Sequence, residues 1–528
     1  MMPVVDQKPF HVKSLQHNIM KQVLLLLFLF IHTSIYAQKE DYAWFIDINR
    51  DGNLPAQGLL YDWNLDNGGP VELDMPYGIT GDNASICDEG GNLLFWSNGC
   101  AVINREQEVM PNGDTLNWDA YREVIGWADC QRGQPGTQDI VILPAPDNNN
   151  GYYIFHKALR YFGQFEDITT DLRISYVDMT LDNGLGDVTY FDSILYDAPV
   201  TPHNLEAIPV DNGENWWILQ PIEDDSLFLT YKLDQGGIER FPDQNSSVFF
   251  ADKRSGAGTM RISPDGAKLA YYDYFLNLHI YDFDRTTGQI SDHQKVTLFE
   301  GAEEMPNSAF RFGSVEWSPN SRFMYVAVRD SLFQVDSWEE DLNDGIRLID
   351  VYDGTSNPFP NTFYIASLAP DCKIYICSTN GNSTYHVIHK PDELGTACDF
   401  VQNGLQLPES TGSANLPLFP RFRVDEEEKC DPTITSVFGQ AVFYRRDLQV
   451  FPNPSHGRYT VEVPETFRSG WLAVISPKGQ IIDQQQVVSG TKQITVDITN
   501  NPTGLYYIEL YPKDNQDRVF WSEKVVKQ

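Results

Sequence analysis

The sequence is poor in basic residues and lacks the short motifs of several enzyme classes. It has 38 lysines and arginines against 74 aspartates and glutamates, and its formal net charge is −36. No His-Glu-x-x-His, Gly-x-Ser-x-Gly, Walker A or Cys-x-x-Cys run occurs. The corresponding metalloprotease, serine hydrolase, nucleotide and zinc-ribbon sites are therefore disfavoured.

The excess of acid is confined to one part of the chain. Residues 1–37 hold three bases and one acid, and residues 447–528 hold eight bases and nine acids, so residues 38–446 carry a net charge of −37. A field of this sign argues against nucleic acid and anionic membranes as partners of that region. It also favours the solubility of a secreted protein.

Long apolar runs are missing, and the one short run lies near the start. Lys21 supplies a positive charge, residues 23–31 form an apolar run, and Ala37 is a small residue suited to a cleavage site. This succession is typical of a signal peptide that is cleaved after Ala37. Nine apolar residues are too few to span a bilayer, and no later run approaches eighteen. We therefore predict a signal peptide at 1–37, with Met20 as the true start, and no integral membrane span in the mature chain.

The middle of the chain lacks helical periodicity and repeats one turn pattern. Pro264-Asp265-Gly266 separates two apolar runs, as expected of a tight hairpin turn. Equivalent Asp or Asn anchors are 59, 64, 54, 55 and 51 residues apart, at positions 88, 147, 211, 265, 320 and 371. Short strands in units of some fifty residues are typical of β-propeller blades, with a β-sandwich as the alternative.

The number of blades follows from the anchors and the ends of the region. Six anchors indicate six full blades. Apolar runs at 44–48 and 59–63 precede the first anchor, and residues 416–424 read as a strand after the last one. We predict that these end segments pair and complete a seventh blade, which gives an all-β chain with a seven-bladed propeller at 38–424.

The C-terminal part has a different pattern. Residues 425–446 read as a linker, and residues 447–528 contain closely spaced strands with strong alternation, such as Tyr459, Val461 and Val463 on one face. About seven strands in roughly eighty residues fit a small immunoglobulin-like β-sandwich.

Two resemblances add a family to these patterns. Ala84-Ser85-Ile86-Cys87-Asp88 and the following turn resemble the propeller of exported Bacteroidetes proteins, which implies fold and localisation but no activity. The C-terminal block resembles the type A sorting domain of the type IX (Por) secretion system. The residues that carry this second resemblance are Pro452, Asn453, Pro454, Gly457, Gly479, Gly504, Tyr506, Lys524 and Lys527. It implies export by that machinery, removal of the domain, and release or attachment at the outer surface.

Seven cysteines in an exported chain permit disulfides and leave at least one residue over. We predict that Cys100 and Cys130 form a disulfide that constrains a long insertion at 101–136. We also predict that Cys377 pairs with Cys398, bracketing the outer strands of one repeat.

Two candidate sites stand out. Asp47, Asn49 and Asp51 have the spacing of the first half of a calcium loop, but Gly58 stands where a bidentate Glu is needed, so a polar turn is favoured over calcium. The insertion carries Trp118, Tyr121 and Trp127, whose rings can stack on sugars or anchor a protein partner; they can equally cap a blade and pack inward.

These observations predict a secreted or surface-attached propeller that binds a glycan or protein ligand, without catalysis and with no cofactor apart from the weak calcium candidate. The alternative is a propeller hydrolase that acts on polysaccharide or peptide, because a fold does not fix a function. A cluster of converging acids or a bound metal in the central channel would favour the hydrolase.

Overall fold

The computed structural model describes residues 38–528, apart from some internal gaps. The gaps are 49–55, 65–69, 115, 118–129, 131, 135, 162–166, 212, 251–257, 274, 300–311, 412–415, 427–428, 433, 435–443, 465–466, 468, 477–480 and 513–518. The predicted signal peptide thus lies outside the described residues. Within them, no helix is long and apolar enough to cross a membrane.

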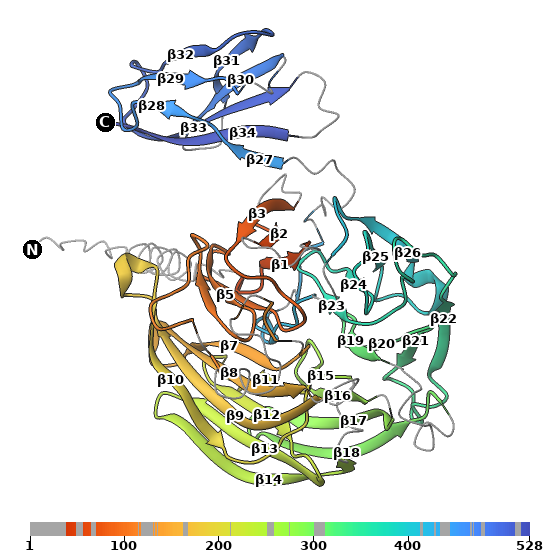
Figure 1. The fold of residues 1–528 in the computed structure, drawn as a ribbon. Helices are drawn as coiled ribbons and strands as arrows, with labels where there is room; N and C mark the ends of the chain where they lie inside the picture. Colours follow the sequence, from red (N-terminus) through yellow and green to blue (C-terminus); the bar gives the residue numbers. More distant parts are fainter. Residues whose placement is uncertain are drawn as a thin grey trace, which may run out of the picture.

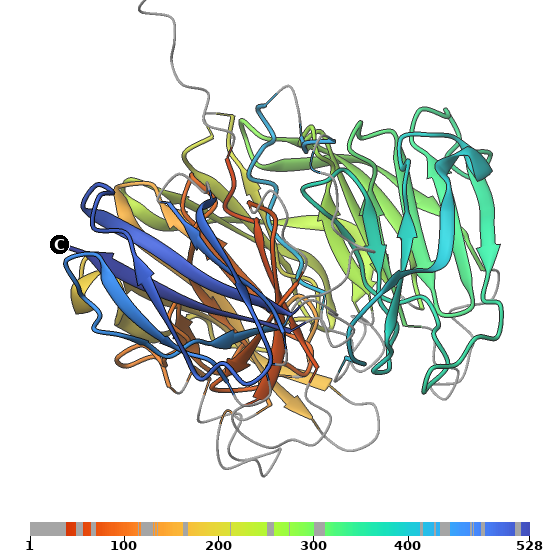
Figure 2. The same ribbon diagram turned by 90° about the horizontal axis from the view of Figure 1, so that it is seen from above.

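Seven antiparallel sheets surround a central axis in the described part of residues 43–406 (Figures 1 and 2). Each sheet uses consecutive strands, and we number these blades 1 to 7. Blade 1 consists of β1 (Ala43–Asp47), β2 (Ala56–Asp62) and β3 (Val71–Met75). Blade 2 consists of β4 (Ala84–Cys87), β5 (Leu93–Ser97) and β6 (Val102–Asn104). Blade 3 consists of β7 (Ile140–Ala145), β8 (Asn148–Tyr161), β9 (Asp167–Asp178) and β10 (Asp187–Tyr196).

Blades 4 to 7 have four strands each. Blade 4 consists of β11 (Glu206–Pro209), β12 (Trp216–Pro221), β13 (Asp225–Asp234) and β14 (Gly237–Phe250), and blade 5 of β15 (Thr259–Ile262), β16 (Lys268–Asp273), β17 (Asn277–Asp284) and β18 (Gln289–Val296). Blade 6 consists of β19 (Gly313–Trp317), β20 (Phe323–Val328), β21 (Ser331–Asp336) and β22 (Ile346–Val351). Blade 7 consists of β23 (Ala366–Leu368), β24 (Ile374–Ile376), β25 (Thr384–Ile388) and β26 (Phe400–Gln406). The predicted propeller with seven blades is confirmed.

The six predicted turns all join the first two strands of blades 2 to 7. In blade 5, the Asp265 carboxylate accepts hydrogen bonds from Ser263 Oγ (2.6 Å) and Ala267 N (3.1 Å), and Gly266 adopts φ 73°. That positive φ suits glycine, which has no Cβ to clash. Local side-chain chemistry therefore sets the hairpins, as the repeated sequence indicated.

The ring closes differently from the prediction. Residues 416–424 form no strand, so the predicted pairing with the first strands is wrong. The segment nevertheless lies beside β1, where Phe419 stacks on Trp44 with ring centroids 6.2 Å apart. Pro417 and Pro420 lack N–H donors, which prevents a regular ladder. We call residues 416–424 the axial segment.

Side chains complete the closure. The Arg423 guanidinium binds both carboxylate oxygens of Asp41 at 2.6 Å and donates to Gln38 O at 2.7 Å. Gln38 N in turn donates to Glu426 Oε1 at 2.9 Å. The two ends of the propeller are therefore joined by ion pairs and hydrogen bonds.

One predicted disulfide is present and the other is replaced. Cys100 pairs with Cys130, whereas Cys372 pairs with Cys430, so the predicted Cys377–Cys398 pair is wrong. Cys377 packs in the core between blade 7 and blade 1, and Cys398 packs in the core on the other side of blade 7. Cys377 directly follows β24, whereas Cys398 ends a short 3-10 helix (Gly395–Cys398), and the two thiols lie in different core clusters.

The C-terminal domain is a two-sheet sandwich, which confirms the predicted fold class. One sheet has the order β27-β34-β33-β30-β31 and the other β28-β29-β32. The strands are β27 (Tyr444–Asp447), β28 (Val450–Phe451), β29 (Arg458–Glu462), β30 (Gly470–Ile475), β31 (Ile481–Val487), β32 (Gln493–Asp497), β33 (Gly504–Pro512) and β34 (Val519–Lys527). Tyr459, Val461 and Val463 are buried in its core, as their alternation predicted.

Candidate functional site

Polar side chains near the axis join several neighbouring blades. Asp82 Oδ1 accepts from Asp139 N (3.0 Å), and Asp139 Oδ1 accepts from His203 N (2.8 Å). Farther round the ring, Thr259 Oγ1 accepts from Val315 N at 2.9 Å, and Ser314 Oγ accepts from Ala366 N at 2.8 Å. These links satisfy backbone donors between neighbouring sheets that no ladder connects.

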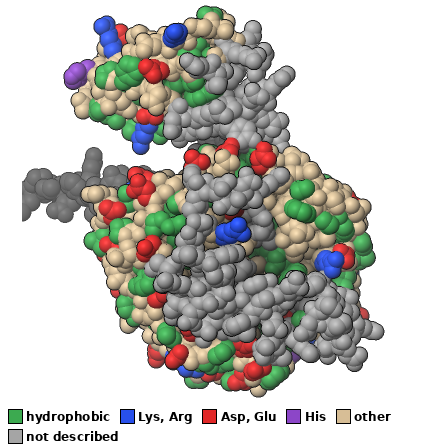
Figure 3. All heavy atoms as spheres, viewed as in Figure 1, with side chains coloured by type: hydrophobic (Ala, Val, Ile, Leu, Met, Phe, Trp, Pro, Cys, Tyr) green, Lys and Arg blue, Asp and Glu red, His purple; other side chains and the backbone are tan. Residues whose placement is uncertain are grey.

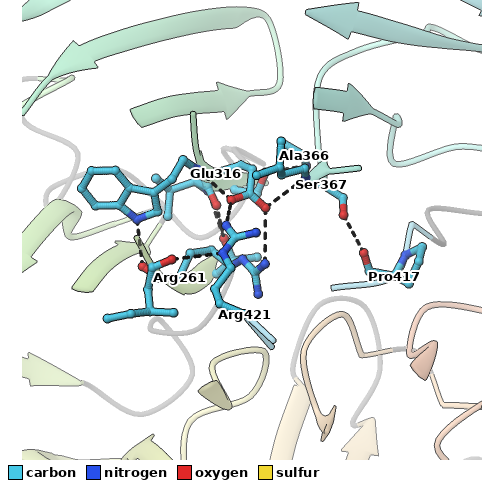
Figure 4. Close-up of polar contacts among 12 residues, drawn as sticks. Arg261, Glu316, Ala366, Ser367, Pro417 and Arg421 are labelled. Carbon is cyan, nitrogen blue, oxygen red and sulfur yellow. Dashed lines mark hydrogen bonds and ion pairs between the residues drawn. The ribbon is translucent and has the colours of Figure 1, made fainter. Parts of the chain in front are cut away.

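Four charged side chains meet near the axis, and Figure 4 labels three of them, Arg261, Glu316 and Arg421. Glu206, Arg261 and Glu316 are buried, and the Arg421 side chain is 10% exposed. Arg261 Nη1 lies 3.3 Å from Glu206 Oε2, and Arg261 Nη2 lies 3.4 Å from Glu316 Oε2. Arg421 of the axial segment forms an ion pair with Glu316 Oε1, and Ser367 Oγ donates to Pro417 O at 2.8 Å. Two acids and two bases balance one another in this axial ion cluster.

The pKa values of the two glutamates are shifted in opposite directions. Burial raises the pKa of Glu206 to about 7, although Arg261 and Arg421 oppose the rise. Burial also acts to raise the pKa of Glu316, but Arg421 and Arg261 outweigh it and hold that pKa below its ordinary value. Glu316 is therefore the carboxylate that anchors Arg421, and Glu206 is the weaker acid of the cluster.

A second buried group lies at the start of blades 3 and 4. Lys157 Nζ is 2.6 Å from Asp139 Oδ1 and donates to Thr201 O at 3.0 Å. Burial lowers the pKa of Lys157, while Asp139 acts to raise it. Asp139 thus binds the ammonium group and the backbone of the next blade together. Both axial groups hold chain segments in place, and we assign them a structural role.

The predicted calcium residues are only partly described. Asp47 Oδ2 accepts a hydrogen bond from Ile79 N at 2.6 Å, so one of its oxygens is used by the backbone. Asn49 and Asp51 lie outside the described residues. Across the described part of the chain, no group of three or more His, Cys, Asp or Glu side chains is placed to hold a metal ion.

The predicted aromatic insertion is described only around its ends. Trp118, Tyr121 and Trp127 lie outside the described residues. Beside them, Asn117 N donates to Asp192 Oδ2 at 2.9 Å, and Asn117 Oδ1 lies 2.8 Å from His156 Nδ1. The described part of the insertion is therefore fastened to blade 3.

The residues of the predicted sorting motif meet at the end of the chain. Asn453 Nδ2 donates to Lys524 O at 2.8 Å, and Val526 N donates to Asn453 Oδ1 at 2.9 Å. Ser455 N donates to Val526 O at 3.0 Å. The segment that contains Pro452 and Pro454 is thus fixed along the terminal strand β34.

The last motif lysine fastens a third segment. Lys527 Nζ donates to Thr499 O at 2.8 Å and also to Asn501 O. Gly457 has φ 102°, and a Cβ there would lie 2.8 Å from Thr499 Cα and 2.9 Å from Lys527 Cε. Glycine at 457 is required both by its φ and by this close approach.

The other motif residues lie on β33 or outside the described chain. Tyr506 is buried, and its hydroxyl donates to Pro502 O at 2.7 Å. Gly504 opens β33 opposite Lys527. Gly479 lies outside the described residues.

Sequence reasoning missed the axial ion cluster. Its signal was present, because Glu206, Arg261 and Glu316 each belong to a short strand whose residues are all buried. A lone charge in such a strand is unusual unless it is paired. Each of these three charges is paired with a residue of another blade or of the axial segment, so the ion pairs form only when the ring is closed.

Comparison with known proteins assigns the C-terminal domain. Residues 449–528 match the secretion system C-terminal sorting domain family. No curated protein matches the chain.

Solved structures resemble the chain only distantly. A functionally unknown protein from Desulfotomaculum acetoxidans is 12% identical, with a TM-score of 0.38 and coverage of 71% of this chain and 99% of that one. The periplasmic gluconolactonase of Pseudomonas aeruginosa is 11% identical, with a TM-score of 0.35 and coverage of 71% and 97%. These values are too low to transfer any activity. The chain is a seven-bladed β-propeller that ends in a sorting domain of the type IX (Por) secretion system.

Proposed function

We propose that this protein is exported through the type IX secretion system and acts outside the cell as a binding scaffold, either released or attached to the outer surface. The match of residues 449–528 to the sorting domain family carries the proposal. The interlocked motif residues support it, because Asn453, Gly457 and Lys527 organise one end of the sandwich around the chain terminus. A signal peptide at 1–37 and removal of the sorting domain belong to the same proposal.

A binding role for the propeller is supported by its construction. The charges on the axis are engaged with one another and with the backbone, which makes the ring a rigid support. Loops on a rigid support are well suited to recognition, because little conformational entropy is lost on binding. The ligand class that we propose is a glycan or a protein. In the view of Figure 3, acidic side chains are scattered over the surface and basic ones are few, which disfavours strongly anionic ligands.

Deletion of residues 448–528 tests the export route. We expect the truncated protein to accumulate in the periplasm, while the full chain reaches the medium or the cell surface. Asn453→Ala and Lys527→Ala should lower export, because each removes a link to the terminal strand or to the Thr499 turn. Lys492→Ala is the matched control, since this exposed lysine lies outside the motif. Undiminished export of the truncated chain would refute the proposal.

A further inference from the structure

Trp338 is the most exposed large hydrophobic residue in the described part of the chain. It lies in the loop between β21 and β22 of blade 6, and 70% of its surface is accessible. A single exposed aliphatic side chain is ordinary, but an exposed indole leaves a large flat apolar surface in water. Leu342, the other large hydrophobic residue of this loop, is buried, so the exposed indole stands alone.

The indole is held in a fixed orientation. The Arg322 guanidinium lies 4.5 Å from the Trp338 ring centroid and 4.7 Å from that of Phe323. Arg322 donates three hydrogen bonds to Asp336, from Nε to Oδ1 at 3.0 Å and to Oδ2 at 3.2 Å and from Nη2 to Oδ2 at 2.7 Å. Asp336 Oδ1 also accepts from Trp338 N at 3.1 Å. One carboxylate thus positions both the ring and the cation that covers one of its faces.

The loop itself is anchored to the neighbouring blade. Asn343 Oδ1 accepts from Thr297 N at 2.9 Å, and Asn343 Nδ2 donates to Lys295 O at 3.3 Å. Asp341 Oδ1 accepts from Asn343 N at 3.0 Å and fixes the turn. A ligand that stacks on Trp338 would therefore meet a surface that is already ordered, which keeps the entropic cost of binding low.

We propose that Trp338 is a stacking platform for a neutral sugar ring, so that blade 6 carries a glycan-binding site. This rests on the proposed function of the propeller as an extracellular binding scaffold. The exposed face of the indole matches the apolar C–H face of a pyranose in size and polarity. Glu339, Glu340 and Asp341 are exposed beside it and can accept hydrogen bonds from sugar hydroxyls.

The surroundings of Trp338 favour a neutral sugar over a cation, an anionic sugar or a protein partner. Arg322 already occupies one face of the ring, and its positive charge weakens the attraction of the opposite face for a second cation. The three exposed carboxylates of the loop repel anionic sugars. A protein partner would gain little from an isolated aromatic residue, since interface hot spots cluster within well-packed apolar surroundings.

Affinity electrophoresis of the purified chain of residues 38–528, which keeps the sorting domain, tests the site. The probes are soluble mixed-linkage β-glucan, xyloglucan, galactomannan and amylose. At least one should retard the wild type, and Trp338→Ala should weaken that binding about tenfold, equivalent to about 1.4 kcal/mol. Trp338→Phe should keep part of the affinity. Trp471→Ala is the matched control, because Trp471 is an exposed indole in the sorting domain at 42% accessibility.

The possible outcomes separate this site from the export route. No retardation of the wild type by any probe, or equal retardation of Trp338→Ala and the wild type, would overturn the glycan site. The melting temperature of Trp338→Ala should match the wild type, because the side chain is exposed. Trp338→Ala should also be exported normally, whereas a failure of the proposed export would appear in the 448–528 deletion and leave glycan binding by the purified chain unaffected.

Discussion

Glu206 should make the propeller less stable as the pH rises. Its pKa is about 7 in the folded chain against an ordinary value of 4.5, and burial is the main cause. A group whose pKa is raised by folding stabilises the folded state fully below its unfolded pKa, and this stability is lost as the pH rises through the folded pKa. The window for Glu206 therefore runs from pH 4.5 to about 7. At about 1.4 kcal/mol per pKa unit, the effect is about 3 kcal/mol.

Glu206→Gln removes this titration while keeping the size and polarity of the protonated side chain. Chemical denaturation at pH 5 and pH 8, followed by tryptophan fluorescence, gives the free energy of unfolding of each protein. We expect the variant to gain stability relative to the wild type by about 3 kcal/mol on going from the lower to the higher pH. Burial also raises the pKa of Glu40 to about 7, and taking the difference between the two proteins removes the contribution of such groups.

The matched control is Glu239→Gln, which changes an exposed residue of β14. Substitution of this exposed side chain should change the free energy of unfolding by less than about 0.5 kcal/mol at either pH. If the difference between Glu206→Gln and the wild type is the same at pH 5 and pH 8, or changes in the opposite direction, the burial argument for Glu206 is refuted.

Two further predictions concern the axial segment and the disulfide between Cys372 and Cys430. Arg421→Ala leaves Glu316 with fewer partners in the buried axis and should destabilise the propeller by about 3–5 kcal/mol in urea denaturation; a loss below about 1 kcal/mol, the value expected of a surface ion pair, would contradict the buried ion cluster. Cys430→Ser opens the disulfide to Cys372, whose partners are 58 residues apart, and should lower stability by about 2–4 kcal/mol. Cys372→Ser should cost about the same, and the double variant should cost no more than either single one; additive losses would show that the thiols act separately.

Local chemistry made the blades predictable from sequence. Asp265 and Gly266 specify their turn within five residues, and the alternation around Tyr459 specifies a buried face without reference to the rest of the chain. The sorting motif was found in the same way, because its residues occur in order near the end of the sequence. These features depend on neighbours along the chain, which a sequence shows directly.

The errors and omissions concern contacts across the closed ring. The axial segment has apolar residues with strand-like spacing, but Pro417 and Pro420 and the ion pairs of Arg421 and Arg423 give it another role. The predicted Cys377–Cys398 pair is absent because Cys377 lies in the core between blades 7 and 1, whereas Cys398, in the 3-10 helix before β26, lies in the core between blades 6 and 7. The partners of Arg421 could not be inferred, because they come from blades that meet only after closure.

The closure described above also orders the events of folding. Each blade uses consecutive strands, so the blades can form from local contacts that are made quickly. The joining contacts are far apart in sequence: Gln38 and Glu426 are separated by 388 residues, and Asp41 and Arg423 by 382. Contacts of such separation form slowly because a long loop must close first. Blade 1 is synthesised first, but the contacts of Gln38 and Asp41 form only after Arg423 and Glu426 have been made. The ring therefore becomes a single cooperative structure only when the chain is complete through residue 426.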